Sequence, residues 1–336
     1  MRTAQLIDGK IELKEMSKPS LDNRSGAIIK VLGCGLCGSD IVKFRHNSVA
    51  DGTVLGHEIV GIIEEVSTKT DFKIGDKVVC SHHIPCSECK YCLGGSYSMC
   101  KHFKETNIFP GGFAEYIYVT EEHLENVAYK IPDTITDEEI SFYEPLACCV
   151  RAIEKAGLNK NDNVLVVGLG SIGLLMAQGL RSYGMRVICC DILDERIEFA
   201  KTKDLDALNS FDLDSFRSQI LEKTDNIGVD CVFMTSGADA AIPLALNTVR
   251  DGGKILVFSS TPKNLSYTNN DIYYRELTVM GSYSPHPRDL RKSFELLTTG
   301  QIDVKNISTN YSLKDISQAF DDTINNKILK AYVEVL

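Results

Sequence analysis

The stretch from Val164 to Gly173 reads VLVVGLGSIG, and it decides the fold of half of the chain. Four apolar residues form a short buried strand, and a glycine-rich turn leads from it into the helical run that follows. Glycines in the pattern G-x-G-x-x-G permit a tight turn and let backbone N–H groups and a helix N-terminus meet a pyrophosphate. The pattern alone is weak, but after a strand and before a helix it predicts a dinucleotide site. Its residues are Gly168, Gly170, Ser171, Ile172 and Gly173.

Asp191 ends the next predicted strand, 18 residues after Gly173. An acid at this offset hydrogen-bonds the adenosine ribose and repels a 2′-phosphate, so the sequence favours NAD over NADP. Asp191 could instead be a simple turn residue, and the nearby Arg196 leaves room for NADP. Thr235 and Ser259 follow later strands and are expected to line the cofactor, although such residues are also ordinary in loops.

The pattern of apolar and polar residues changes near residue 150. From there, apolar strands alternate with helical patterns, which predicts a doubly wound α/β domain with a parallel sheet. Its predicted strands cover 163–167, 185–190, 229–234 and 254–258. The preceding part has short Val/Ile runs broken by Gly and Asp and predicts an irregular, mostly β domain. A helix at 287–298 and an apolar run at 330–335 are expected to return to that domain, so we divide the chain into 1–145, 146–281 and 282–336.

Composition limits the class of protein. Charged residues make up 24% of the 336 residues and hydrophobic residues 43%, and no apolar run is long enough for a membrane span. The beginning of the chain does not resemble a secretory signal, so a cytoplasmic location is expected. The net charge of −10 is spread along the chain, which argues against nucleic acid as a partner.

Four of the twelve cysteines form a compact motif, Cys86-x2-Cys89-x2-Cys92-x7-Cys100. Four thiolates within fifteen residues can close a tetrahedron around Zn²⁺, as a structural zinc site requires. An iron–sulfur cluster is the alternative, but the bacterial ferredoxin run ends in x3-Cys-Pro, whereas here the last gap is seven residues. Four unligated thiols would be poorly placed among such polar neighbours.

A second group of metal ligands is spread along the chain. Cys37 lies in GLCGSD at 35–40, and His57 and Glu58 lie in GHE at 56–58. Glu144 comes just before the α/β domain. Each would be ordinary alone, but together they offer the mixed ligands that a catalytic zinc site accepts while one position stays open.

The motifs in this order resemble the zinc-dependent medium-chain dehydrogenase/reductase superfamily. The matching elements are 35–40, 56–61, the four-cysteine motif, GGFAEY at 111–116, 144–146 and the glycine-rich turn. The resemblance implies a GroES-like catalytic domain, a Rossmann coenzyme domain, NAD, and two zinc ions per chain, one catalytic and one structural. It also implies a homodimer or homotetramer. Ser67 departs from the Gly or Ala that the family usually has there.

Glu144, in place of a third cysteine or histidine, resembles the sorbitol (polyol) dehydrogenase branch. That resemblance implies that Cys37 and His57 bind zinc, and that Glu58 and Glu144 bind it directly or through its water. Asp40 would orient His57, and Ser39 would pass on the substrate proton. Either of these two residues could instead cap a helix. The shuttle histidine of some relatives is replaced by Val42, and His46 is a candidate substitute.

The implied reaction interconverts a secondary alcohol of a polyol, cyclitol or sugar derivative and its ketone. Ser284 and Lys43 stand where sorbitol dehydrogenases have an arginine and a tyrosine, so a different pocket is expected. The further candidates for its lining are Phe109, His286 and Arg288. His82 and His83 are interpreted as structural. Alternatives are a threonine-type amino-alcohol dehydrogenase, a zinc-free quinone reductase, which would not explain the cysteine motif, and a non-catalytic nucleotide sensor.

Overall fold

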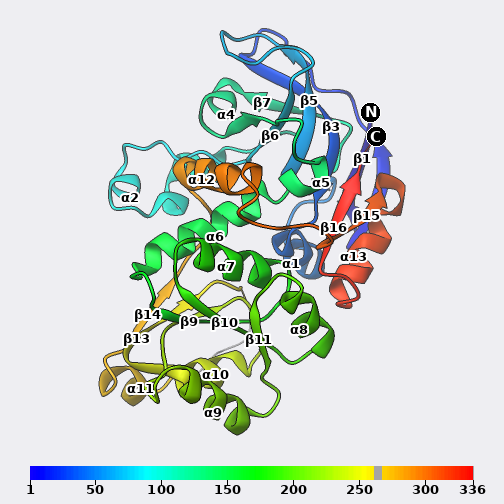
Figure 1. Cartoon of the computed structure of the whole chain (residues 1–336). Coiled ribbons are helices and arrows are strands. Elements are labelled where there is room, and N and C mark those ends of the chain that lie inside the picture. Colours follow the sequence, from blue (N-terminus) through cyan, green and yellow to red (C-terminus); the bar gives the residue numbers. More distant parts are fainter. Residues whose placement is uncertain (261–266, 336) are drawn as a thin grey trace. The chain divides into compact units, whose positions relative to one another are not determined.

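The computed structural model describes residues 1–260 and 267–335, and the chain divides into two compact units (Figure 1). Unit 1 comprises Met1–Ala147, Pro285–Gly300 and Val304–Leu336, and unit 2 comprises Cys148–Ser284 and Gln301–Asp303. Helix α6, Tyr143–Ala156, begins in unit 1 and ends in unit 2. The mixed α/β class is confirmed, with one mostly β unit and one unit built on a parallel sheet.

Unit 1 contains a seven-stranded sheet and a three-stranded sheet. The larger has the order β15-β16-β3-β5-β6-β8, with β7 paired to β3, and the smaller has the order β2-β1-β4. The strands are β1 Arg2–Ile7, β2 Lys10–Glu15, β3 Gly26–Gly35, β4 Thr53–Val54, β5 Glu58–Val66, β6 Lys77–Cys80, β7 Tyr116–Thr120, β8 Ala128–Lys130, β15 Ser308–Ser312 and β16 Lys330–Glu334.

The helices of unit 1 are short, apart from the amphipathic α12. They are α1 Gly38–His46, α2 Lys90–Leu93, α3 Lys101–Glu105, α4 Glu121–Asn126, α5 Asp137–Ile140, α12 Pro287–Thr298 and α13 Ile316–Ile324, with 3₁₀ turns η1 Tyr97–Met99 and η2 Leu313–Asp315. The predicted helix at 287–298 is confirmed with the same bounds. His286 caps it and proline occupies its first turn, a favourable helix start.

Strand β3 organises unit 1, because it pairs with β5, β7 and β16. Every residue from Gly26 to Val31 except Lys30 is buried. The antiparallel pairing of β16 with β3 places Tyr332 opposite Gly35. Strand β16 therefore pairs with β3 inside unit 1 and lies beside the beginning of α1.

Unit 2 is a six-stranded parallel sheet with the order β11-β10-β9-β12-β13-β14. The strands are β9 Asn163–Val167, β10 Arg186–Asp191, β11 Asp206–Asn209, β12 Val229–Met234, β13 Val249–Val257 and β14 Thr278–Gly281. The helices are α7 Ser171–Ser182, α8 Asp194–Lys201, α9 Leu213–Lys223, α10 Ala241–Thr248 and α11 Asn269–Tyr273. Side chains of α9 and α10, among them Phe216 and Ile242, pack with Leu165 and Val232 of the sheet.

Two predicted strands, β9 and β12, match the structure residue for residue. Strand β13 begins at Val249, five residues before the predicted start at 254. The pair Gly252 and Gly253 suggests a turn in the sequence, but here it continues the strand through an irregular register with β12. Gly252 has a φ of 69°, a conformation that glycine adopts without strain.

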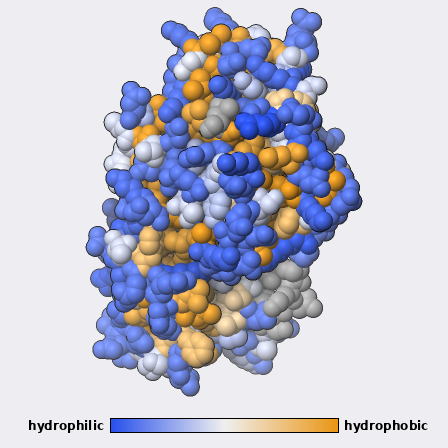
Figure 2. Space-filling model, turned by 90° about the vertical axis from the view of Figure 1, so that its right-hand side faces the viewer, coloured by the Kyte–Doolittle hydropathy of each residue, from blue (hydrophilic) through white to orange (hydrophobic). Residues whose placement is uncertain are grey.

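Hydrophilic side chains cover most of the face shown in Figure 2, and hydrophobic ones form scattered groups on it. Within 1–260 and 267–335, none of the helices combines the length and the apolar character that a membrane span needs.

The glycine-rich turn of unit 2 has the expected strand, turn and helix arrangement. Gly168 follows β9 with a φ of 98°, in the left-handed region that favours glycine. Gly170 is the N-cap of α7. A side chain at Gly173 would overlap with the backbone oxygen of Gly168, so the close approach of helix and turn requires glycine at this position.

Replacing Gly173 by alanine is expected to destabilise unit 2 by about 1–3 kcal/mol, because the added methyl group must push the helix away from the turn. Gly170→Ala is the matched control, since a Cβ there meets no atom within 4 Å. Its stability should stay within about 0.5 kcal/mol of the original. Urea unfolding of both variants measures the difference, and equal stability of the two would contradict the packing argument.

Candidate functional site

Cys37, His57 and Glu58 form one cluster in unit 1, with ligand atoms that all lie within 4.8 Å of one another. Cys37 is the N-cap of α1, two residues after the end of β3, while Glu58 is the first residue of β5 and His57 precedes it. The antiparallel register of β3 with β5 places Gly35 opposite Glu58. A side chain at Gly35 would overlap with the Glu58 carboxylate, so glycine at this position gives that carboxylate its room.

Asp40 holds the residues of this cluster in position. It is fully buried in α1, and its Oδ2 accepts a hydrogen bond from the Cys37 N–H at 3.2 Å. Its Oδ1 accepts one from the Gly56 N–H at 3.3 Å and lies 3.6 Å from His57 Nδ1. One carboxylate thus orients the imidazole and both backbone segments that carry the ligands.

The interpretation of Asp40 or Ser39 as the helix cap is wrong, because Cys37 occupies the N-cap. Ser39 and Asp40 are the second and third residues of α1, and Ser39 is exposed. Asp40 reaches back to the cap from the third position, as the acidic partner in a capping box does. Burial opposes charge on His57, but the negative charges of Asp40 and Cys37 raise its pKa well above the ordinary value.

Lys330, the first residue of β16, forms a buried ion pair with Oε2 of Glu58. Only 5% of the lysine side chain is exposed and none of the Glu58 side chain. Burial opposes the lysine charge, yet the charges of Glu58 and Cys37 raise the pKa of Lys330. The other oxygen, Oε1 of Glu58, is buried and has no hydrogen-bond partner among the described residues.

This orphaned oxygen tests whether the cluster fits a metal. A buried carboxylate oxygen without a partner is costly, and a cation beside it removes that cost. One thiolate, one imidazole and one carboxylate oxygen are ligands that zinc accepts, and three protein ligands leave a position open. The residues present therefore fit a catalytic zinc ion.

Glu144 is the second residue of α6 and is 5% exposed. It lies near enough to Lys330 for its charge to contribute to the raised pKa of that lysine. Among the described residues, the group of ligand atoms within 4.8 Å comprises Cys37, His57 and Glu58 without Glu144. The carboxylates of Glu58 and Glu144 thus both interact with the positive charge of Lys330. Of the two, only Glu58 groups with Cys37 and His57 among the described residues.

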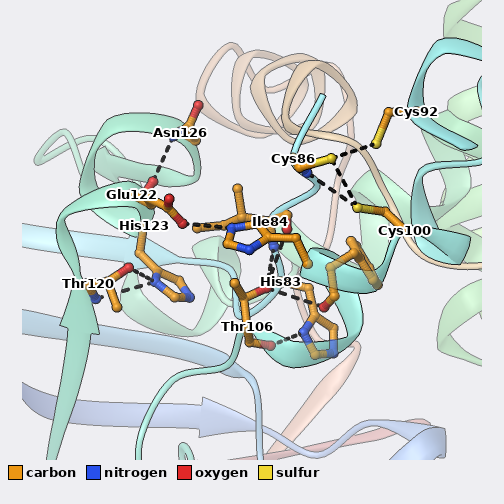
Figure 3. A network of polar contacts seen from close by, with 12 residues as sticks. His83, Ile84, Cys86, Cys92, Cys100, Thr106, Thr120, Glu122, His123 and Asn126 are labelled. Atoms are coloured by element: carbon orange, nitrogen blue, oxygen red, sulfur yellow. Dashed lines mark hydrogen bonds and ion pairs between the residues drawn. The ribbon is translucent and has the colours of Figure 1, made fainter. Parts of the chain in front are cut away.

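Two further histidines extend the cluster. The ring of His82 lies 4.5 Å from that of His57, and the ring of His83 lies 4.0 Å from that of His82, measured between centroids. His83 Nδ1 contacts the carbonyl oxygen of Thr106, as Figure 3 shows. Burial lowers the pKa of His83 to about 4 and the pKa of His82 well below its ordinary value. Both rings are therefore neutral at pH 7.

The four-cysteine motif forms a separate lobe, seen with three of its cysteines in Figure 3. Its sulfur–sulfur distances are 3.5 Å for Cys86–Cys100, 3.6 Å for Cys89–Cys92 and 4.0 Å for Cys86–Cys92. A zinc ion with Zn–S bonds of about 2.3 Å holds its sulfurs about 3.8 Å apart. No disulfide joins these cysteines. Burial alone would raise the pKa of the Cys100 thiol, but hydrogen bonds from the N–H groups of Cys86 and Phe103 lower it to about 6. The lobe fits a structural zinc ion.

In unit 2, Asp191 is buried at the end of β10. Its Oδ2 accepts a hydrogen bond from the Leu169 N–H at 2.8 Å, and its Oδ1 accepts one from the Ile192 N–H at 2.8 Å. Arg196 lies 3.6 Å from the same carboxylate. Asp191 therefore connects β10 to the glycine-rich turn, with a cation beside it.

The remaining cofactor candidates also gather near this turn. Ser171 and Ile172 begin α7. The Thr235 hydroxyl donates to the carbonyl oxygens of Val167 and Gly168, at 2.9 and 3.0 Å, so it stabilises the backbone at the start of the turn. Ser259 lies past β13, and its N–H donates to the carbonyl of Met234.

The pocket candidates divide into two groups. The ring of His286 lies 4.0 Å from that of Tyr97, and Arg288 stacks over the same tyrosine, so both attach α12 to the cysteine lobe. Lys43, by contrast, is half-buried in α1, and its positive charge contributes to the lowered pKa of His82. Phe109 is 52% exposed, as an apolar wall residue would be. Val42 and His46 are exposed.

The sequence analysis did not identify Lys330, the buried partner of Glu58. Lys330 stands 272 residues from Glu58, and no local motif connects them. The only sequence signal is a lysine at the head of an apolar terminal strand, where a charged residue needs a partner.

Comparisons with known proteins identify the family. Residues 23–133 match the alcohol dehydrogenase GroES-like domain, and residues 171–299 match the family described as zinc-binding dehydrogenase. A sorbitol dehydrogenase of Halalkalibacterium halodurans is 32% identical over 311 residues, covering 90% of this chain and 89% of that protein. The D-xylulose reductase A of Aspergillus niger is 28% identical, covering 96% and 93%.

Solved structures agree with this result. The crystal structure of galactitol-1-phosphate dehydrogenase from Escherichia coli superposes with a TM-score of 0.87 at 25% identity and covers 100% of both chains. The similarity spans both units and both motif groups. The chain therefore belongs to the zinc-binding medium-chain alcohol dehydrogenases, in their polyol dehydrogenase branch.

Proposed function

We propose that this enzyme is a zinc-dependent NAD oxidoreductase that interconverts a secondary alcohol of a polyol, cyclitol or sugar derivative and its ketone. The observation that carries the proposal is the cluster of Cys37, His57 and Glu58. In it, the buried Oε1 atom of Glu58 has no hydrogen-bond partner in the described part of the chain. The relatives named for sorbitol, D-xylulose and galactitol 1-phosphate support a polyhydroxylated substrate.

In this proposal Cys37, His57 and Glu58 hold the catalytic zinc ion, and the cysteine lobe holds a structural one. Bound there, zinc would act as a Lewis acid that lowers the pKa of the substrate hydroxyl. Asp40 keeps one ring nitrogen of His57 occupied and so directs the other toward the metal. Lys330 balances the charge of Glu58 in the buried site.

Ser39 would receive the substrate proton. It lies two residues after Cys37 on the first turn of α1, and its exposed side chain can pass the proton to water. Glu144 would serve as an exchanging ligand, or hold a displaced water, from its buried position near Lys330. The catalytic part of the chain then comprises 1–145 and 282–336.

Residues 146–281 would bind NAD, the acceptor of the hydride. The turn at Gly168, Gly170 and Gly173 offers its N–H groups and the start of α7 to the pyrophosphate. Asp191 would accept hydrogen bonds from the adenosine ribose, and its charge disfavours the 2′-phosphate of NADP. Thr235 and Ser259 would stand along the bound dinucleotide.

A panel of sugar alcohols, cyclitols and sugar phosphates, each with NAD and with NADP, tests the activity. We expect reduction of NAD, in preference to NADP, with at least one polyol. Cys37→Ser should lower kcat/KM by about a thousandfold or more, because zinc supplies several kcal/mol of charge stabilisation. It should also halve the zinc content measured by elemental analysis.

Cys34→Ser is the matched control for this substitution. Cys34 is buried in β3, three residues before Cys37 and outside the cluster, and its Sγ donates to the Gly35 carbonyl oxygen as a serine hydroxyl can. Its turnover should stay within a few-fold of the unaltered enzyme. Undiminished turnover of Cys37→Ser would refute the zinc mechanism. Turnover of threonine alone would favour an amino-alcohol dehydrogenase, and absence of turnover with any alcohol would favour a nucleotide sensor.

Removal of the Lys330 charge tests the role of the ion pair. In Lys330→Met, Glu58 loses its buried counter-charge and the ion pair that holds its carboxylate in place, so we expect zinc at the catalytic site to bind about 10–100-fold more weakly. Lys330→Arg keeps the charge and should retain most of the affinity. Competition with a chromogenic chelator measures the affinity of the labile zinc. Equal affinity in Lys330→Met and the unaltered enzyme would show that Glu58 does not depend on the lysine.

A further inference from the structure

His82 is half-buried and differs from the neighbouring histidines of unit 1 in its hydrogen bonding. Its Nδ1 is buried and has no hydrogen-bond partner among the described residues. His123, in contrast, uses Nδ1 with Thr120 and Nε2 with the carbonyl oxygen of His82, and His83 uses Nδ1 with the carbonyl oxygen of Thr106. Among the described residues, His123 and His83 thus have a partner for Nδ1, whereas His82 leaves its Nδ1 unused.

The place of this ring makes the unused nitrogen significant. His82 lies two residues after the end of β6, and its ring is tilted against that of the metal-ligand candidate His57, with 4.5 Å between the centroids. The hydrogen bond from His123 to its carbonyl oxygen, at 3.1 Å, fixes its backbone. An imidazole held in one place beside the ligand cluster, with a nitrogen left over, is preorganised to bind a polar group of a molecule that reaches the metal.

The chemistry of that polar group follows from the unused nitrogen itself. An imidazole nitrogen donates or accepts one hydrogen bond, which suits a hydroxyl group, since a hydroxyl can do either, or a carbonyl oxygen when the nitrogen donates. In a vicinal diol the second oxygen is only three bonds (O–C–C–O) from the oxygen on the reacting carbon, so it stays close to the ligand cluster. Because the His82 ring lies next to that of His57, we expect its unused nitrogen to meet this second oxygen. The positive charge of Lys43 is close enough to influence the same ring.

We propose that His82 is a specificity-determining residue that hydrogen-bonds the hydroxyl on the carbon adjacent to the reacting one. The substrates are then vicinal diols in the oxidative direction and α-hydroxy ketones in the reductive direction. This inference rests on the proposed function and narrows its substrate class. The interpretation of His82 as a purely structural residue is replaced, while His83, whose Nδ1 is occupied by Thr106, keeps a structural role.

The test compares butane-2,3-diol with butan-2-ol, which lacks the second hydroxyl, at saturating NAD. His82→Phe keeps an aromatic ring against His57 but removes the nitrogens. We expect it to lower kcat/KM for the diol about tenfold or more, because a buried polar group of the substrate loses its partner. The value for butan-2-ol should change less than about threefold. His82→Asn, with a polar atom near the position of Nδ1, should restore much of the activity with the diol.

His83→Phe is the neighbouring control, and it should not change the ratio of the two kcat/KM values. The zinc content of His82→Phe should equal that of the unaltered enzyme, which separates substrate binding from loss of metal. Equal losses with both alcohols, or no loss with either, would overturn the role of His82 and leave the proposed function intact. If the unaltered enzyme oxidises neither alcohol nor any polyol, the proposed function fails and this inference fails with it.

Discussion

The buried ion pair between Glu58 and Lys330 is the interaction on which the geometry of the candidate site depends. Taking two charges out of water is costly, and the cost is offset only when they meet in good geometry. Here the pair joins the first residue of β5 to the first residue of β16. One carboxylate oxygen is used by the lysine, and the other is buried without a hydrogen-bond partner among the described residues, in the residue that clusters with Cys37 and His57. The end of the chain is therefore part of the site.

Local motifs made much of this structure predictable. The strands at Asn163–Val167 and Val229–Met234, the glycine-rich turn and the helix Pro287–Thr298 follow from short-range patterns of apolar residues, glycine and proline. The cysteine lobe was predictable for the same reason, since its four sulfurs lie within fifteen residues. The proximity of Cys37 and His57 could be predicted only through a resemblance to known enzymes, because it depends on the register of β3 with β5.

Contacts between distant parts of the chain were beyond the reach of sequence patterns. The register of β16 with β3 brings Lys330 to Glu58, and no spacing rule connects positions so far apart. The cap of α1 was misplaced because a cysteine occupies the position that Ser or Asp usually takes. For His82, the decisive fact is an unused ring nitrogen, which depends on what its neighbours bind.

Crystals of the enzyme, measured at the zinc absorption edge, test the central claim most directly. The account predicts two anomalous peaks in each chain. One lies among the sulfurs of the cysteine lobe, and the other contacts Cys37, His57 and the Oε1 atom of Glu58. A peak at the cysteine lobe alone, or a signal at the iron edge in place of zinc, would contradict it.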